Sequence, residues 1–279
     1  MHKDPDLTQQ ETHFAFGKNW ASYAAGVGDS QLEQARRGLA RLLGDDLRNK
    51  RFVDVGCGSG VHALAALSLG ATEVVAIDID PDSVATTRTL LETYAGGSAW
   101  SAHHASVFEL DYATLGDFDV AYSWGVLHHT GDMNRAVRCA AKLVRPGGEF
   151  ALALYRRTFF CELWKAEKKW YTAADTQAQK RAERMYIEAF RAGLAVTGRS
   201  LGKYVASYQN ERGMDFYHDV RDWLGGWPYE SVTAQDVDRL MEPLGFARTR
   251  MFGKAGVGVG LFGVGCNEYV YKRRTGPAK

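Results

Sequence analysis

Cysteine is scarce in this chain and forms no pattern that would build a site. The four cysteines, Cys57, Cys139, Cys161 and Cys266, show no CxxC motif and no Cys/His spacing typical of zinc sites or disulfide frameworks. This predicts a reducing, intracellular setting and no metal centre.

Two further features are missing, and each excludes a class of protein. No stretch of about 18 apolar residues could span a bilayer, and the polar residues 1–13 lack the apolar core of a signal peptide. The formal net charge is only +1, and no long run of Lys and Arg could wrap a nucleic acid. We therefore expect a cytoplasmic protein without membrane insertion whose partner is not nucleic acid. Its oligomeric state stays open.

The chain does have enough apolar sequence for a substantial core, since 46% of its 279 residues are apolar. A capping box at Ser30 and Glu33 begins a helix before the first strand. From residue 45 to 155, short apolar runs then alternate with helical patterns. The expected strands are residues 51–55, 73–79, 100–104, 118–123 and 149–154. This alternation predicts an α/β fold whose mostly parallel sheet is covered by helices on both faces.

After Tyr155 the alternation stops. Residues 156–230 predict an insertion made mainly of helices, and residues 231–279 complete the sheet. Five aromatic residues are expected to form core between the added helices and the sheet: Trp164, Trp170, Tyr171, Tyr186 and Phe190.

Between residues 212 and 231 we expect a loop that mixes charged and aromatic side chains. Arg212, Asp215 and His218 in this loop suit a polar, ring-shaped acceptor. A network that only fixes the loop is the alternative explanation for the same residues.

The first expected strand runs into the turn GCGSG, where Gly56, Gly58 and Gly60 let the backbone approach a ligand closely. Dinucleotide-binding proteins use a related turn but place a third glycine three residues after the second, and Val61 stands there. The spacing therefore disfavours NAD.

Two carboxylates lie beside this turn. Asp54, two residues before Gly56, suits the positively charged amino group of a methionine moiety. Asp78 ends the second strand, where a carboxylate can accept hydrogen bonds from ribose hydroxyls. Asp80 precedes Pro81 and is expected to cap a helix instead.

Four motifs in order, VDVGCGSG, AIDID, FDVAYSWGVLHHT and LVRPGGEF, resemble class I methyltransferases that use S-adenosylmethionine (SAM), over roughly residues 45–155. The resemblance implies a Rossmann-like, seven-stranded sheet, SAM as methyl donor and S-adenosylhomocysteine as product. It also implies where the cofactor binds: the methionine end near Gly56, Cys57 and Gly58, the ribose near Asp78 and Ile79, the adenine near Ser106 and Val107, with Trp124 lining the pocket. Ser106 departs from the family, because many members carry Asp there.

A narrower resemblance spans nearly the whole chain. FAFGKNWASY, SWGVLHHTGDM, RGMDFYHDVRDWLGGWPYES and GVGCNEYVYKR are similar to segments of methyltransferases often encoded among cell-surface polysaccharide genes. By that resemblance, residues 1–44 hold a flap in which Phe16, Trp20 and Tyr23 cover the cofactor, and residues 156–230 form a substrate cap.

Candidate catalytic residues follow the fourth and fifth strands. His128, His129 and Tyr155 lie at the carboxyl edge of the sheet, where open α/β folds bind ligands. Methyl transfer to a hydroxyl needs a base, and histidine suits that work near neutral pH. His129 is the first candidate, with a helix-start or packing role as the alternative. It resembles the histidine of the EXXEH element in ubiquinone-pathway O-methyltransferases, but Gly125 and His128 replace the two glutamates, which argues against that metal site.

The sequence thus predicts SAM-dependent methyl transfer to an oxygen of a small molecule or glycan. The acceptor would be held under a lid made of the N-terminal segment and the insertion. Two rivals stay open: an RNA or protein methyltransferase, and a non-catalytic SAM-binding regulatory module.

Overall fold

A computed structural model describes residues 6–9, 12–14, 28–212, 216–253 and 260–276. Its centre is a seven-stranded sheet with the order β3-β2-β1-β4-β5-β7-β6. The strands are β1 Arg51–Val55, β2 Glu73–Asp78, β3 Trp100–His104, β4 Phe118–Trp124, β5 Val144–Tyr155, β6 Phe246–Phe252 and β7 Cys266–Arg273. Of the seven strands in this sheet, β7 alone runs antiparallel to the others. The expectation of a mostly parallel, seven-stranded sheet is confirmed.

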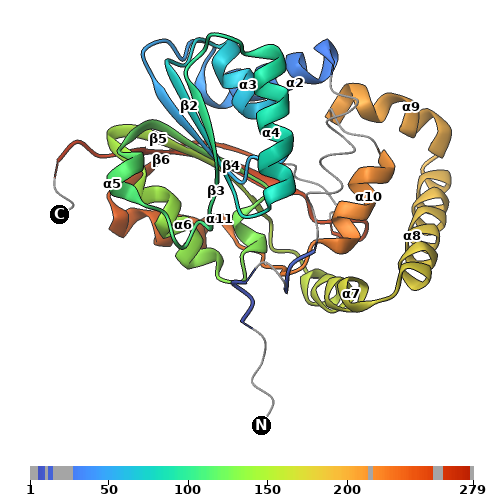
Figure 1. The fold of residues 1–279 in the computed structure, drawn as a ribbon. Helices are drawn as coiled ribbons and strands as arrows, with labels where there is room; N and C mark the ends of the chain where they lie inside the picture. The colour runs from blue at the N-terminus through green and yellow to red at the C-terminus, as the bar shows by residue number, and fades with distance from the viewer. Residues whose placement is uncertain (1–5, 10–11, 15–27, 213–215, 254–259, 277–279) are drawn as a thin grey trace.

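Helices cover both faces of this sheet. The α-helices are α2 Asp29–Leu43, α3 Val61–Ser68, α4 Pro81–Tyr94, α5 Tyr112–Leu115, α6 Met133–Lys142, α7 Cys161–Ala173, α8 Thr176–Val196, α9 Leu201–Arg212, α10 Phe216–Gly225 and α11 Ala234–Met241, with short 3₁₀ turns η2 Leu127–His129 and η3 Glu242–Leu244. Figure 1 shows α2, α3 and α4 on one face and α5, α6 and α11 on the other. The molecule therefore has three layers.

The central strands explain why the sequence shows apolar runs rather than alternation. In β1, Phe52 packs in the cluster under α2, α3 and α4, and Val53 packs in the cluster under α6 and α11. Val74 and Val75 of β2 divide in the same way. Both faces of β1 and β2 are buried, so most of their positions are apolar.

The helices α7 to α10 lie in an arc beside the sheet (Figure 1). They share a third cluster of buried side chains with the end of β5, and the aromatic residues of this cluster make most of the contacts. The described N-terminal residues also reach this region, because the Phe14 N–H donates to the Trp227 carbonyl at 3.0 Å. None of the described helices has the length and apolar character needed to cross a bilayer.

Three local expectations are wrong. The helix α2 begins two residues earlier than the Ser30–Glu33 capping box requires, since its N-cap is Gly28 and Gln31 accepts the Gly28 N–H at 3.1 Å. Glu33 instead pairs with Arg36 and Arg37, each at 2.7 Å, which uses the carboxylate that the box would have needed. Asp80 does cap α4, as expected, by accepting the Asp82 N–H.

The segment expected as a mixed loop after residue 212 contains the helix α10 instead. Phe216, Val220 and Trp223 recur at helical spacing and are buried, so a single apolar face holds the segment against α7 and β5. Trp170 corrects a second expectation in the insertion. Its side chain is 53% exposed, whereas its neighbour Tyr171 is buried in the third cluster.

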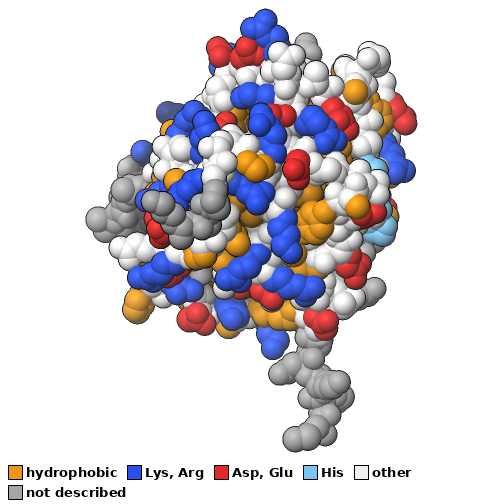
Figure 2. Space-filling view, turned by 90° about the vertical axis from the view of Figure 1, so that its left-hand side faces the viewer, with side chains coloured by type: hydrophobic (Ala, Val, Ile, Leu, Met, Phe, Trp, Pro, Cys, Tyr) orange, Lys and Arg blue, Asp and Glu red, His pale blue; other side chains and the backbone are white. Residues whose placement is uncertain are grey.

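The surface farthest from α8 carries charges of both signs. Figure 2 shows Lys and Arg side chains scattered over this face, with Asp and Glu side chains and hydrophobic ones among them. The mixture agrees with a formal net charge of +1 for the whole chain.

Replacing Gly56 by alanine should lower the free energy of unfolding by more than the strain of a positive φ alone. Its φ is +82°, and an added Cβ would lie 2.4 Å from Val126 Cγ2. Gly97 is a matched control, because its φ is +85° and a Cβ would have no neighbour within 4 Å. By urea denaturation, Gly97→Ala should cost about 1 kcal/mol, and Gly56→Ala about 1–3 kcal/mol more. Equal losses would show that the Val126 contact has no energetic weight.

Candidate functional site

The glycine turn joins β1 to α3 at the carboxyl edge of the sheet. Gly56, Gly58 and Gly60 all have positive φ, at +82°, +53° and +81°. The N–H groups of Gly56 and Cys57 both donate to the Ile77 carbonyl, at 2.7 and 3.1 Å, so the turn is attached to β2. The positive φ that favours glycine is therefore present at all three positions.

Asp78 lies at the end of β2 and faces this turn. Its carboxylate accepts the Gly58 N–H and the Asp80 N–H, each at 2.9 Å. Burial raises the pKa of Asp78 to about 6, and the two backbone N–H groups oppose that shift. The carboxylate is therefore oriented before any ligand arrives.

Asp54 lies on β1 next to Asp78 and is almost fully buried. Its Oδ2 atom has no hydrogen-bond partner among the described residues. Burial, with a smaller contribution from the negative charge of Asp78, raises the pKa of Asp54 to about 8. A buried carboxyl without a partner is costly. A cationic ligand group is what this position lacks, and the amino and sulfonium groups of SAM fit that requirement.

The other expected cofactor residues occupy the same edge. Val107 is buried and Ser106 half-buried after β3, with Ser106 Oγ accepting the Phe108 N–H at 3.3 Å. The Ile79 carbonyl accepts a hydrogen bond from His104 at 2.9 Å. Burial raises the pKa of the Cys57 thiol well above its usual value, so it stays protonated.

Trp124, at the end of β4, is held by residues that sequence reasoning missed. Its indole Nε1–H donates to Glu268 of β7 at 2.9 Å, and Arg41 of α2 binds the other oxygen of Glu268 at 2.5 Å. His62 stacks on the Trp124 ring with 6.5 Å between centroids. No sequence signal could have linked these residues, because they come from four separate elements.

The three candidate catalytic residues lie together. The ring centroids are 4.4 Å apart for His128 and His129, 3.9 Å for His128 and Tyr155, and 5.2 Å for His129 and Tyr155. They meet because η2 follows β4 and Tyr155 ends the neighbouring strand β5.

The two histidines have different proton arrangements. His129 Nδ1–H donates to the Pro228 carbonyl at 2.7 Å, and a hydrogen bond with the Gly226 backbone also acts on this ring. His128 Nδ1 accepts the Tyr155 N–H at 3.4 Å, so its proton is on Nε2, where no hydrogen-bond partner lies among the described residues. Burial lowers the pKa of His129 to about 3, and that of His128 also falls well below its usual value. Both rings are neutral at physiological pH.

Lys168 of α7 is a buried cation beside this cluster that the sequence did not reveal. Its Nζ donates to the Trp223 carbonyl and lies 3.6 Å from the Trp223 ring centroid and 5.5 Å from that of Tyr229. Burial lowers its pKa. The trapped ammonium ties α7 to α10 and to the segment after it.

The expected flap and substrate residues are only partly described. Phe16, Trp20, Tyr23 and Asp215 lie outside the described residues, as does the side chain of Arg212. His218 is half-buried on α10, one residue before Asp219, which accepts the Tyr208 hydroxyl and links α10 to α9. Within the described ranges, no three His, Cys, Asp or Glu side chains gather closely enough to hold a metal ion.

Comparison with known families decides the classification. Residues 29–247, most of the chain, match the family model described as a methyltransferase domain. The chain belongs to this methyltransferase domain family. Its members use SAM as the methyl donor, which agrees with the glycine turn and the two carboxylates beside it.

Several characterised methyltransferases are similar to this one over part of their length. The ubiquinone biosynthesis O-methyltransferase of Aromatoleum aromaticum is 33% identical over 113 residues, which are 40% of this chain and 47% of that protein. The ribosomal protein L11 methyltransferase of Photobacterium profundum is 36% identical over 115 residues, 41% of this chain and 37% of that protein. The chain matches less than half the length of these relatives.

One solved methyltransferase structure aligns with nearly the whole of this chain. The magnesium protoporphyrin IX methyltransferase of Synechocystis PCC 6803, with bound SAM, has a TM-score of 0.57 and 14% identity, covering 98% of this chain and 99% of that one. At this identity the likeness shows a common fold.

The stability of this methyltransferase should fall as pH rises, through Asp54. Its pKa is about 8 in the folded protein against 3.8 as the reference value, so the folded state holds the proton over a range where the unfolded state has lost it. Stability from this group is complete below pH 4 and is lost as pH approaches 8. Asp54→Asn should flatten this slope and exceed the wild type in stability at pH 8, measured by urea denaturation. Asp45→Asn, at an exposed site, should keep the wild-type slope; if Asp54→Asn keeps it too, Asp54 does not carry the effect.

Proposed function

We propose that this chain transfers the methyl group of SAM to an oxygen of a small molecule or glycan. The observation that carries the proposal is the pair of buried carboxylates at the glycine turn, one of which has an oxygen without a partner. SAM bears both a cationic amino acid end and a ribose, and the two acids suit one each. A bound sulfonium supplies an activated methyl group, so the protein has mainly to align the acceptor.

In this proposal Asp54 binds the amino group of SAM and Asp78 accepts from the ribose hydroxyls. The backbone of Gly56, Cys57 and Gly58 approaches the methionine end. The remaining cofactor contacts are proposed for Trp20, Tyr23, Ile79, Ser106, Val107 and Trp124. The Trp124–Glu268 hydrogen bond supports a fixed orientation of that indole.

Proton removal from an acceptor hydroxyl is assigned to His129. Its Nδ1–H is held by the Pro228 carbonyl, which fixes the orientation of the neutral ring, and Nε2 is the nitrogen proposed to take the proton. His128 has the opposite tautomer, so its Nε2–H would donate a hydrogen bond to the acceptor. Tyr155 would contact the acceptor from β5, since its ring packs on both histidines.

The proposed division of the chain follows from these roles. Residues 45–155 bind SAM, residues 1–44 and 156–230 cover the site, and residues 231–279 complete the sheet. The hydrogen bond from Phe14 to Trp227 supports a cover built from both segments. Arg212, Asp215 and His218 are proposed acceptor contacts of this cover. A glycan acceptor is favoured by the resemblance to methyltransferases often encoded among polysaccharide genes.

A protein acceptor is the second candidate. It rests on the 36% identity to the ribosomal protein L11 methyltransferase over 115 residues. Transfer of labelled methyl from SAM into fractionated cell extract separates the two: label in proteins would support the second candidate, and label in small molecules or glycans the first. Tight SAM binding with no label in any fraction would favour a non-catalytic SAM-binding module.

Replacing Asp78 by asparagine should weaken SAM binding, because the amide keeps the size of the side chain but loses the charge that ribose hydroxyls would bond. Loss of a hydrogen bond to a charged group predicts an increase in Kd of roughly 10- to 100-fold. Titration calorimetry measures it. Asp117→Asn, exposed at the opposite edge of the sheet, should leave Kd unchanged. An unchanged Kd for Asp78→Asn would remove the ribose assignment.

Replacing His129 by asparagine should lower kcat while SAM binding stays at the wild-type level. The amide can still donate to Pro228, so the change removes the basic nitrogen with little loss of structure. General-base catalysis predicts a decrease of roughly 10²- to 10⁴-fold, measured with labelled SAM and the fraction of extract that accepts methyl. His103→Asn, exposed on β3, is the control. Wild-type turnover in His129→Asn would end its candidacy as the base.

A further inference from the structure

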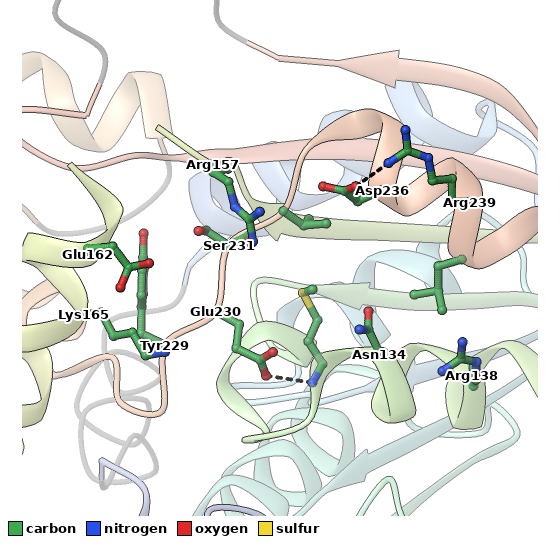
Figure 3. Close-up of a pocket in the computed structure, with 13 residues that line it drawn as sticks. Asn134, Arg138, Arg157, Glu162, Lys165, Tyr229, Glu230, Ser231, Asp236 and Arg239 are labelled. Carbon is green, nitrogen blue, oxygen red and sulfur yellow. Dashed lines mark hydrogen bonds and ion pairs between the residues drawn. The ribbon is translucent and has the colours of Figure 1, made fainter. Parts of the chain in front are cut away.

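A cavity of about 490 Å³ lies at the carboxyl edge of the sheet, outside the residues assigned above. Its floor is formed by α6 and α11, and its walls by α7 and by the segment Tyr229–Val232. Figure 3 shows side chains from all four elements turned toward the same space. Ligands of open α/β folds bind beyond this edge.

Three cations from three different elements line this cavity at separate places. They are Arg138 of α6, Arg157 just after β5, and Lys165 of α7 (Figure 3). None of the three forms an ion pair with any carboxylate among the described residues, although many other arginines of the chain do. Arg157 is oriented by one hydrogen bond, from Nη2 to the Ser231 carbonyl at 2.9 Å.

The acidic side chains of the cavity offset this charge only in part. Asp236 forms an ion pair with Arg239 at 3.0 Å, and Glu230 accepts the Met133 N–H at 2.7 Å (Figure 3). Burial raises the pKa of Glu230, while nearby Lys165 acts in the opposite direction. Glu162 stays exposed on α7. Carboxylate and amide groups beside the cations suit the hydroxyls of a sugar-like molecule.

The cavity shares one wall with the proposed reaction site. In that wall, the Glu230 N–H donates to the His128 carbonyl at 3.0 Å and the Val232 N–H to the Tyr155 carbonyl at 2.9 Å. The Tyr229 ring lines the cavity and lies 5.4 Å from the Tyr155 ring. A molecule held in the cavity would therefore be separated from the histidines by the segment Tyr229–Val232.

The geometry points to this cavity as a subsite for an anionic group, phosphate or carboxylate, of a hydroxylated methyl acceptor. Arg138, Arg157 and Lys165 bind the anion, and Glu162 and Asn134 accept and donate to hydroxyls. Arginine is well suited to this task, because its planar guanidinium binds phosphate and carboxylate through two parallel hydrogen bonds. The acceptor assignment rests on the proposed methyl transfer, but binding of the anion does not.

The first experiment measures the anion alone. Inorganic phosphate is titrated into the full chain by calorimetry at constant ionic strength. Arg138→Gln and Lys165→Gln, both at exposed positions, should each weaken phosphate binding roughly tenfold. Lys203→Gln, at an equally exposed position on α9, should not change it. Equal phosphate affinity in all four proteins, or no binding to the wild type, would overturn the subsite.

The second experiment tests the acceptor class. Labelled methyl transfer is compared for neutral monosaccharides, their phosphates and the corresponding uronic acids. The anionic sugars should accept more labelled methyl than the neutral ones. A preference for sugar phosphates would identify phosphate as the bound anion, and a preference for uronic acids would identify carboxylate. Lys165→Gln should raise KM for them without lowering kcat. Equal use of neutral and anionic sugars would overturn the acceptor assignment. Variant-sensitive phosphate binding without SAM binding or label would instead reject methyl transfer and leave the anion site standing.

Discussion

The hydrogen bond from the Gly58 N–H to the Asp78 carboxylate joins the turn after β1 to the end of β2, and much of the cofactor edge depends on it. To form this bond, the turn must pass close to β4, where Val126 leaves no room for a side chain on Gly56. The same geometry places Asp54 beside Asp78 in a buried environment, so neither carboxyl can be fully solvated. The raised pKa of both acids follows from that confinement. Confinement in this turn therefore disfavours the charged form of both acids.

A second constraint acts at the other end of the edge, where the inserted helices meet the sheet. The His129–Pro228 bond and the contacts of residues 230 and 232 with the strand ends attach the segment after α10 to β4 and β5. Lys168 attaches the same region to α7 through the Trp223 carbonyl. A buried ammonium with aromatic rings and one carbonyl around it is costly to leave unpaired. These contacts make the insertion part of the candidate reaction site rather than an appendage of the sheet.

Sequence alone predicted the elements whose signal is local. Parallel strands buried on both faces appear as short apolar runs, and Gly56, Gly58 and Asp78 stand at the ends of such runs, so the cofactor edge could be located from spacing. Lys168 and Glu268 could not be found in this way, because their partners lie 55 and 144 residues away. The expectation of a loop after residue 212 was wrong for a different reason. The charged residues of this segment suggest a loop, although Phe216, Val220 and Trp223 recur at helical spacing. Periodicity would have found that helix.

The two ends of the edge differ in the kind of ionisable side chain they gather. At the glycine turn two carboxyls are buried close together, and in the cavity bounded by α6, α7 and α11 three cations form no ion pair among the described residues. The first group is buried, while the second is partly exposed and screened by salt. A cationic donor and an anionic acceptor would each be attracted to the end that suits it, and the histidines lie between the two. Because desolvation makes the acidic end the more selective of the two, cofactor affinity should depend on pH more strongly than on salt, and anion binding on salt more strongly than on pH.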